Sequence, residues 1–352
     1  MKVYRKGLDK WDLTPIIRQT DRQTDRHLHW VDALKGYGIF CVTFAHLNPL
    51  RLIEVHIYSY HMFLFFFISG YLYKTQSLDD YLRKKIKSLL VPFLLWNLLS
   101  SLVELLITHD LQDVVDRFLI LHGKVCWNAP IWFLLILFLC ESVYALIDNA
   151  WRSIFTPHIV FCFSTVLWIL YGQLNAPLKL NLLPLALFSF SFGKIFQGIT
   201  QRKVYSANSV NAMMCITAML SILFGAILNK RISYTGATFG NLFYCFVAAI
   251  SGCVFFTVLF KNCEQIGLNQ YLCLLGKNSM AIMVMQYWLF RLFDFMGEKT
   301  FGISIWYGRS TLKALGVSII TISLILTCTG IIKKISKKNK IILCVSELFG
   351  LR

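Results

Sequence analysis

Two ionisable side chains, Lys35 and His46, lie in an otherwise apolar stretch near the start of the chain. They are eleven residues apart, close to three helical turns, so a helix here presents both on one face, roughly 16 Å apart. An ammonium group suits an anionic ligand, and an imidazole suits proton transfer near neutral pH. The pair indicates a functional site; the alternative is a snorkelling Lys35 and a His46 that bonds a backbone carbonyl.

This apolar stretch runs from Trp30 to Lys74 and is typical of two helices joined by a short polar link. The second helix ends in Ser69-Gly70, where the glycine lets a neighbouring helix or a ligand approach closely. Further along, Glu141 lies near the middle of another apolar segment, where a carboxylate needs a partner. It is a candidate for orienting an imidazole or holding a substrate hydroxyl, and equally for a structural hydrogen bond.

A basic run follows the second apolar segment and contains Arg83, Lys84, Lys85 and Lys87. Such a cluster is a normal topology signal on the inner side of a membrane. Because it would lie beside Lys35, it is also a candidate for holding the phosphates of a nucleotide-like donor.

The composition indicates a polytopic membrane protein. The chain has 352 residues, 57% hydrophobic residues and 29 Phe, with a mean hydropathy of +0.60. The net charge of +17 does not indicate nucleic-acid binding, because the charges cluster between apolar runs and form no basic face with interleaved aromatics. The 11 Cys are scattered, without CxxC pairs or a Cys/His cluster at metal spacing, so we expect no metal site.

About ten apolar segments reach spanning length, which predicts an all-α protein with about ten transmembrane helices. They lie near residues 31–50, 57–74, 88–108, 130–148, 157–173, 181–197, 210–228, 238–260, 278–296 and 312–332. If the N-terminus is inside, 24 of the 35 basic residues fall in inner segments. This asymmetry predicts that both termini are cytoplasmic.

Three regions follow from this pattern. Residues 1–29 are a polar, basic tail that we expect to be disordered or weakly helical, residues 30–332 form the membrane domain, and residues 333–352 are a basic cytoplasmic tail. In the ninth segment, Gly276 to Ser279 predict a turn and helix start, and Arg291 and Asp294 can pair on one face.

Several motifs in this order resemble the membrane acyltransferase 3 family, the multi-spanning bacterial enzymes that O-acetylate surface polysaccharides and related glycans. The matching positions are Asp32-x-x-Lys35-Gly36, His46, His61-Met62-x-x-Phe65-Phe66-x-x-Ser69-Gly70-Tyr71, the basic run before Pro92, Trp132-Phe133-Leu134 and Gly276-Lys277-Asn278-Ser279. The resemblance covers about residues 30–330 and is most specific up to Gly70.

The resemblance implies a ten-helix domain in the bacterial cytoplasmic membrane, with acyl-CoA as donor and a hydroxyl of a free or lipid-linked saccharide as acceptor. Acetyl-CoA is then a co-substrate, and no bound cofactor is expected. The essential histidine of the family corresponds to His46, and Lys35 stands where the family has an arginine. Lysine keeps the charge but not the bidentate fork.

These observations combine into a catalytic hypothesis. Acyl-CoA binds from the cytoplasm, with its phosphates near Lys35, Arg83, Lys84 and Lys85, and Ser69-Gly70 at the same inner end. His46 acts as a base or carries the acyl group, Asp32 positions Lys35, and Glu141 assists. The alternatives are succinyl transfer, a transporter of a lipid-linked saccharide without chemistry, and a structural partner in glycan assembly.

Overall fold

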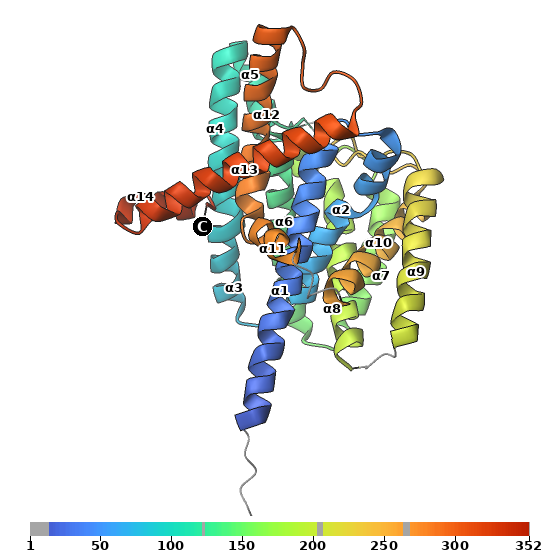
Figure 1. Cartoon of the computed structure of the whole chain (residues 1–352). Helices are drawn as coiled ribbons and strands as arrows, with labels where there is room; N and C mark the ends of the chain where they lie inside the picture. Colours follow the sequence, from blue (N-terminus) through green and yellow to red (C-terminus); the bar gives the residue numbers. More distant parts are fainter. Residues whose placement is uncertain (1–13, 122–123, 203–206, 263–267, 352) are drawn as a thin grey trace, which may run out of the picture.

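The chain folds into helices, and the described residues contain no strand beyond one isolated bridge between Ser233 and Thr238. The computed structural model describes residues 14–121, 124–202, 207–262 and 268–351. Its α-helices are α1 Thr14–Ala45, α2 Arg51–Leu72, α3 Leu78–Lys85, α4 Val91–Thr108, α5 Leu111–Phe118, α6 Trp132–Trp151, α7 Thr156–Tyr171, α8 Leu183–Arg202, α9 Ala207–Ile222, α10 Leu242–Asn262, α11 Leu268–Lys277, α12 Ser279–Phe301, α13 Thr311–Ser336 and α14 Lys340–Leu348 (Figure 1). Short π-helical or 3-10 segments are η1 Ile86–Leu90, η3 Ala129–Ile131, η4 Pro177–Leu182 and η5 Leu223–Ile227.

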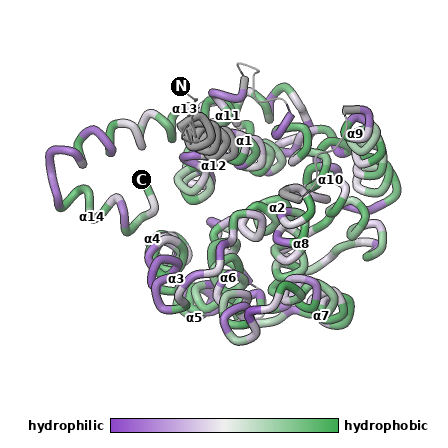
Figure 2. Tube along the Cα trace, turned by 90° about the horizontal axis from the view of Figure 1, so that it is seen from below, coloured by the Kyte–Doolittle hydropathy of each residue, from purple (hydrophilic) through white to green (hydrophobic). Residues whose placement is uncertain are grey.

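Most of these helices run along a common axis and are hydrophobic over much of their length (Figures 1 and 2). Within the described residues, seven helical stretches are long and apolar enough to cross a membrane: Arg51–Leu72, Leu78–Thr108, Ala129–Trp151, Pro177–Thr200, Asn208–Ile227, Leu242–Asn262 and Thr311–Ser336. The protein is therefore an all-α, multi-pass membrane protein. Helices α1, α7 and α12 cover the other three expected segments, and α7 is shorter than a full span. Ten spans and cytoplasmic termini stay predictions.

Helices α2 and α8 cross at a pair of glycines. A Cβ added to Gly70 would lie 1.8 Å from the Phe190 carbonyl oxygen, and one added to Gly193 would lie 2.1 Å from the Phe67 carbonyl oxygen. Small residues at such crossings allow two backbones to meet closely in a membrane. Gly70 is thus occupied by a neighbouring helix, which is one of the two uses expected for it, and no ligand is needed to explain it.

Helices α1 and α11 meet in the same way. A Cβ on Gly36 would lie 1.8 Å from the Leu272 carbonyl oxygen, and a Cβ on Gly276 would lie 1.8 Å from the Asp32 carbonyl oxygen. The sequence predicted a turn and helix start over Gly276 to Ser279. The helix α12 does begin at Ser279 after Asn278, but Gly276 lies inside α11, a short helix that the sequence did not predict. This contact holds α1 at the level of Asp32 and Lys35.

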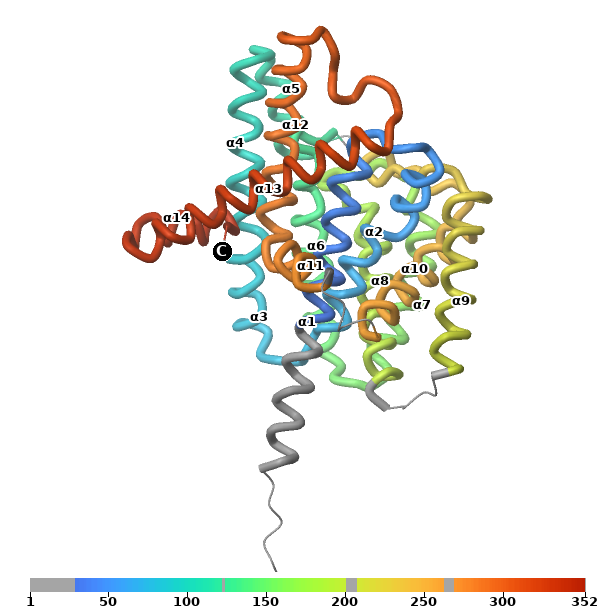
Figure 3. The backbone as a smooth tube through the Cα atoms, in the orientation of Figure 1, coloured from blue at the N-terminus to red at the C-terminus, as the bar shows by residue number. Residues whose placement is uncertain are grey.

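Helix α13 differs from the other long helices because it crosses the bundle obliquely and leads to α14 at its side (Figure 3). The chain then returns to α4, where Trp96 Nε1 donates to the Phe349 carbonyl oxygen at 3.0 Å and the two rings meet edge to face. The segment expected as a basic tail from residue 333 thus begins inside α13 and continues into α14. At the other end, α1 begins at Thr14, and residues 1–13 of the expected tail lie outside the described residues.

The expected pairing of Arg291 with Asp294 does not occur among the ion pairs of the described residues. Arg291 lies over the Trp306 ring at 5.5 Å, and Asp294 accepts hydrogen bonds from the Ser304 hydroxyl and the Ile305 amide. Both groups contact the loop of residues 302–310 instead, which fixes that loop against α12.

Candidate active site

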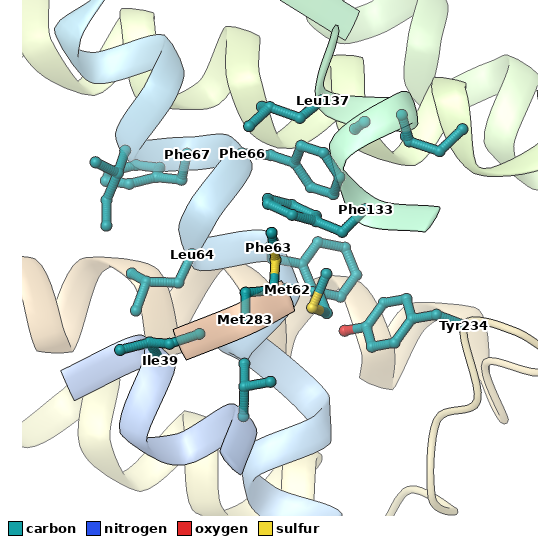
Figure 4. Close-up of a cluster of buried hydrophobic side chains, with 14 of the residues drawn as sticks. Ile39, Met62, Phe63, Leu64, Phe66, Phe67, Phe133, Leu137, Tyr234 and Met283 are labelled. Carbon is teal, nitrogen blue, oxygen red and sulfur yellow. The ribbon is translucent and has the colours of Figure 1, made fainter. Parts of the chain in front are cut away.

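A cavity of about 180 Å³ lies between α1, α2, α6, α12 and the loop of residues 228–241. Its lining residues come from these elements and from η3: Ile39, Val42, His46, Tyr58, His61, Met62, Phe65, Ala129, Pro130, Trp132, Phe133, Arg231, Ser233, Tyr234, Thr235, Met283 and Tyr287. Figure 4 shows the apolar part of this wall, where Met62, Phe133 and Met283 from three helices lie close together. We call this space the His46 cavity.

The imidazole of His46 is fixed on several sides. His46 directly follows the last residue of α1, and its Nδ1 lies 3.0 Å from the Tyr58 hydroxyl of α2. The Tyr287 ring of α12 meets the imidazole edge to face, with the ring centroids 5.2 Å apart. Trp306 Nε1 donates to the His46 carbonyl oxygen at 3.3 Å. With Nδ1 occupied by Tyr58, Nε2 is the ring nitrogen available for proton transfer.

Tyr58 is itself held by two residues of the 228–241 loop. The Tyr234 hydroxyl donates to the Tyr58 carbonyl oxygen at 2.8 Å, and the Arg231 guanidinium lies 4.3 Å from the Tyr58 ring centroid. Burial raises the pKa of the Tyr234 phenol well above its usual value, so this group stays a neutral donor. The loop therefore positions the side chain that positions His46.

A carboxylate anchors this arrangement on α2. Glu54 is buried, and its Oε1 lies 2.5 Å from Arg231 Nε, while its Oε2 pairs with Arg309 of the 302–310 loop. Burial lowers the pKa of Arg231, but Tyr58 and Glu54 outweigh that effect and raise it, so the guanidinium stays charged. One carboxylate thus joins two loops to α2 next to Arg231, which lines the His46 cavity.

A second polar cluster lies at the other end of the same helices. Lys85 Nζ of α3 lies 2.7 Å from Glu141 Oε2 of α6, and Ser69 is within hydrogen-bonding reach of the same carboxylate. The charges of Asp32, Lys85 and Glu141 act on the Lys35 ammonium, which is largely buried. We call these groups the Lys85–Glu141 cluster. Arg83 and Lys84 are exposed on α3 beside it.

The two clusters are connected by one face of α1. Lys35, Ile39, Val42 and His46 follow the spacing of one helix face; the last three line the His46 cavity, and Lys35 belongs to the Lys85–Glu141 cluster. The structure places Glu141 with Lys85, not beside His46, and gives Asp32 no ion pair with Lys35 among the described residues. The sequence did not single out Tyr58, Glu54, Arg231 or Tyr287.

The Lys85–Glu141 pair carries a first prediction. Replacing Glu141 by leucine leaves the Lys85 ammonium in the bundle without its carboxylate, and we expect the free energy of unfolding to fall by about 3 kcal/mol. The double variant Lys85→Met, Glu141→Leu removes both charges and should recover most of this loss. The measurement is a denaturant titration in detergent micelles. If the double variant is as unstable as Glu141→Leu alone, the loss of stability does not come from the unpaired Lys85 charge.

The comparisons with known proteins identify the family of this chain. Searches of curated proteins and of solved structures each return no match. The sequence model of one family, described as an acyltransferase domain, matches residues 28–332, which contain both clusters and every helix from α2 to α12. This match covers most of the chain, and the protein belongs to the acyltransferase 3 family.

Proposed function

We propose that this protein is an O-acyltransferase that moves an acetyl group from acetyl-CoA to a hydroxyl of a cell-surface or exported saccharide. The observation that carries the proposal is the oriented imidazole of His46 in a cavity with aromatic walls. Trp132, Tyr234 and Tyr287 offer ring faces against which a sugar can pack, and the polar groups converge on His46.

The chemistry assigns one task to His46. In the tautomer with Nδ1–H donating to the Tyr58 oxygen, Nε2 takes the proton of the acceptor hydroxyl. The hydroxyl oxygen bonds to the thioester carbonyl carbon, the carbon–sulfur bond breaks, and the CoA thiolate takes the proton back from the imidazolium. The products are the acetyl ester and free CoA, and the imidazole ends neutral.

The donor is proposed to enter at the Lys85–Glu141 cluster. Arg83 and Lys84 are exposed and free to meet the phosphates of CoA. Lys35 lies deeper, on the face of α1 that leads to the His46 cavity. Lys85 was expected to contact the CoA phosphates, but its charge is neutralised by Glu141. Lys85 therefore contributes to the shape of the entry, and the charge that meets phosphate comes from its neighbours on α3.

A deletion strain tests this function. We expect surface glycans of the wild type to carry an acetyl mass increment that disappears on deletion and returns on complementation, measured by mass spectrometry of isolated glycans. A succinyl increment in its place would identify the donor as succinyl-CoA. If the glycan carries the same acylation in both strains but accumulates inside the deletion cells, the protein is a transporter and the proposed function is wrong.

A further inference from the structure

The ion-pair cluster beside the His46 cavity carries more positive than negative charge. Glu54 is shared by Arg231 and Arg309, so two guanidinium groups meet one carboxylate. A single arginine would suffice to balance a buried carboxylate. The second leaves a net positive charge at this position.

Neighbouring charged groups do not neutralise this excess. The buried Lys179 ammonium of η4 donates to the Thr235 carbonyl oxygen, and Lys313 donates to the carbonyl oxygens of Tyr307 and Gly308. Both bonds go to neutral carbonyls. Asp294, the acidic group of the adjoining part of α12, accepts from neutral groups and forms no ion pair among the described residues.

Arg231 brings the excess charge into the cavity. Its Nε is used by Glu54 and its guanidinium also reaches the Tyr58 hydroxyl, but 42% of its side chain is exposed, so part of the guanidinium can meet a ligand. Arg231 is also the one lysine, arginine, aspartate or glutamate among the cavity residues that the structure describes. Arginine binds a carboxylate or a phosphate through a planar fork.

A single tyrosine separates this cation from the proposed base. The Tyr58 ring lies beneath the Arg231 guanidinium at 4.3 Å, and the Tyr58 hydroxyl lies 3.0 Å from His46 Nδ1. A ligand that reaches both Arg231 and His46 must therefore hold its acidic group and its reacting hydroxyl about the length of one tyrosine side chain apart. That spacing fits the same sugar residue or the next one.

Resting on the proposed function, we propose that the acceptor is an anionic saccharide whose acidic group pairs with Arg231 while its hydroxyl faces His46. The acidic group is the carboxylate of an acidic sugar or a phosphate of the glycan. A neutral saccharide would leave the excess positive charge of Arg231 and Arg309 unbalanced in the complex, a cost that an anionic acceptor avoids.

The test locates the acetyl ester in glycans from wild-type and deletion cells by tandem mass spectrometry. We expect it on a residue that carries an acidic group or adjoins one. Reduction of carboxyl groups with a deuterated reagent identifies an acidic sugar, and hydrofluoric acid, which cleaves phosphodiesters, identifies a phosphate. An ester on a wholly neutral glycan overturns this inference and leaves the acyltransferase function standing. If no ester depends on the gene, the proposed function fails and this inference fails with it.

Variants supply the second arm. Arg231→Gln should lower the ester content at least about tenfold at equal protein level, because a charge-assisted contact is lost. Arg231→Lys keeps the charge and the pair with Glu54 and should retain more ester than Arg231→Gln. Lys124→Gln is the matched control, since Lys124 is an exposed cation paired with Asp113 away from the cavity. Equal ester content in Arg231→Gln and wild type contradicts the assignment.

Discussion

Replacing His46 by alanine is expected to lower acetyl transfer by about 10²- to 10⁴-fold, the contribution typical of a positioned general base. The variant removes Nε2 but leaves Tyr58, Arg231 and the aromatic walls in place, so acceptor binding should change little. The measurement is release of free CoA from acetyl-CoA by the purified protein in lipid nanodiscs, with the acylated glycan as the second readout.

Two matched variants make this result specific to His46. His56 is another histidine of the same end of the molecule, but its Nε2 bonds Ser221 at 3.1 Å and it does not line the cavity. His56→Ala should retain activity close to that of the wild type. Tyr58→Phe removes the hydrogen bond to Nδ1 and should cost about tenfold, mainly in kcat. Full activity of His46→Ala would remove His46 from the chemistry.

Adding one methyl group at Gly276 is expected to cause the largest structural loss. The Cβ of Gly276→Ala would lie 1.8 Å from the Asp32 carbonyl oxygen, a backbone atom that no side-chain rotation can move. Overpacking of this kind costs about 3 kcal/mol or more and would push α1 away from α11. We expect little folded protein and no transfer, measured by size-exclusion profile in detergent and by CoA release.

The control lies in α13. Gly316 is also helical, but nothing lies within 4 Å of a Cβ added there. Alanine is preferred over glycine inside a helix, so Gly316→Ala should be neutral or slightly stabilising. If Gly276→Ala behaves like Gly316→Ala, the close approach of α1 and α11 is not needed for folding.

The sequence predicted the features that depend on nearby residues. The face shared by Lys35 and His46 depends on helical spacing alone, and the structure has Ile39 and Val42 on that face between them. The acyltransferase family was identified from motif order and is confirmed by the match over residues 28–332. The apolar runs gave the helices, because length and hydropathy are local properties.

The sequence could not predict contacts between distant segments. Glu54 lies 177 residues before Arg231 and 255 before Arg309, and no local pattern relates them. Glu141 was expected to orient an imidazole, to hold a substrate hydroxyl or, equally, to form a structural hydrogen bond. Its partner is a lysine of the basic run, which the sequence analysis did not connect with it. The short helices α11 and α14 were missed because neither reaches spanning length.

The glycine contact between α1 and α11 has a consequence for the order in which the protein is made. Asp32 and Gly276 are far apart in the sequence, so α1 leaves the ribosome long before the helix that packs against it. Lys85 and Glu141 can pair much earlier, because they are close in the chain. Each nascent chain therefore waits in the bilayer with α1 unsupported at Asp32 and Gly36, and the site is completed only when synthesis has passed Tyr287 and Trp306, which contact His46.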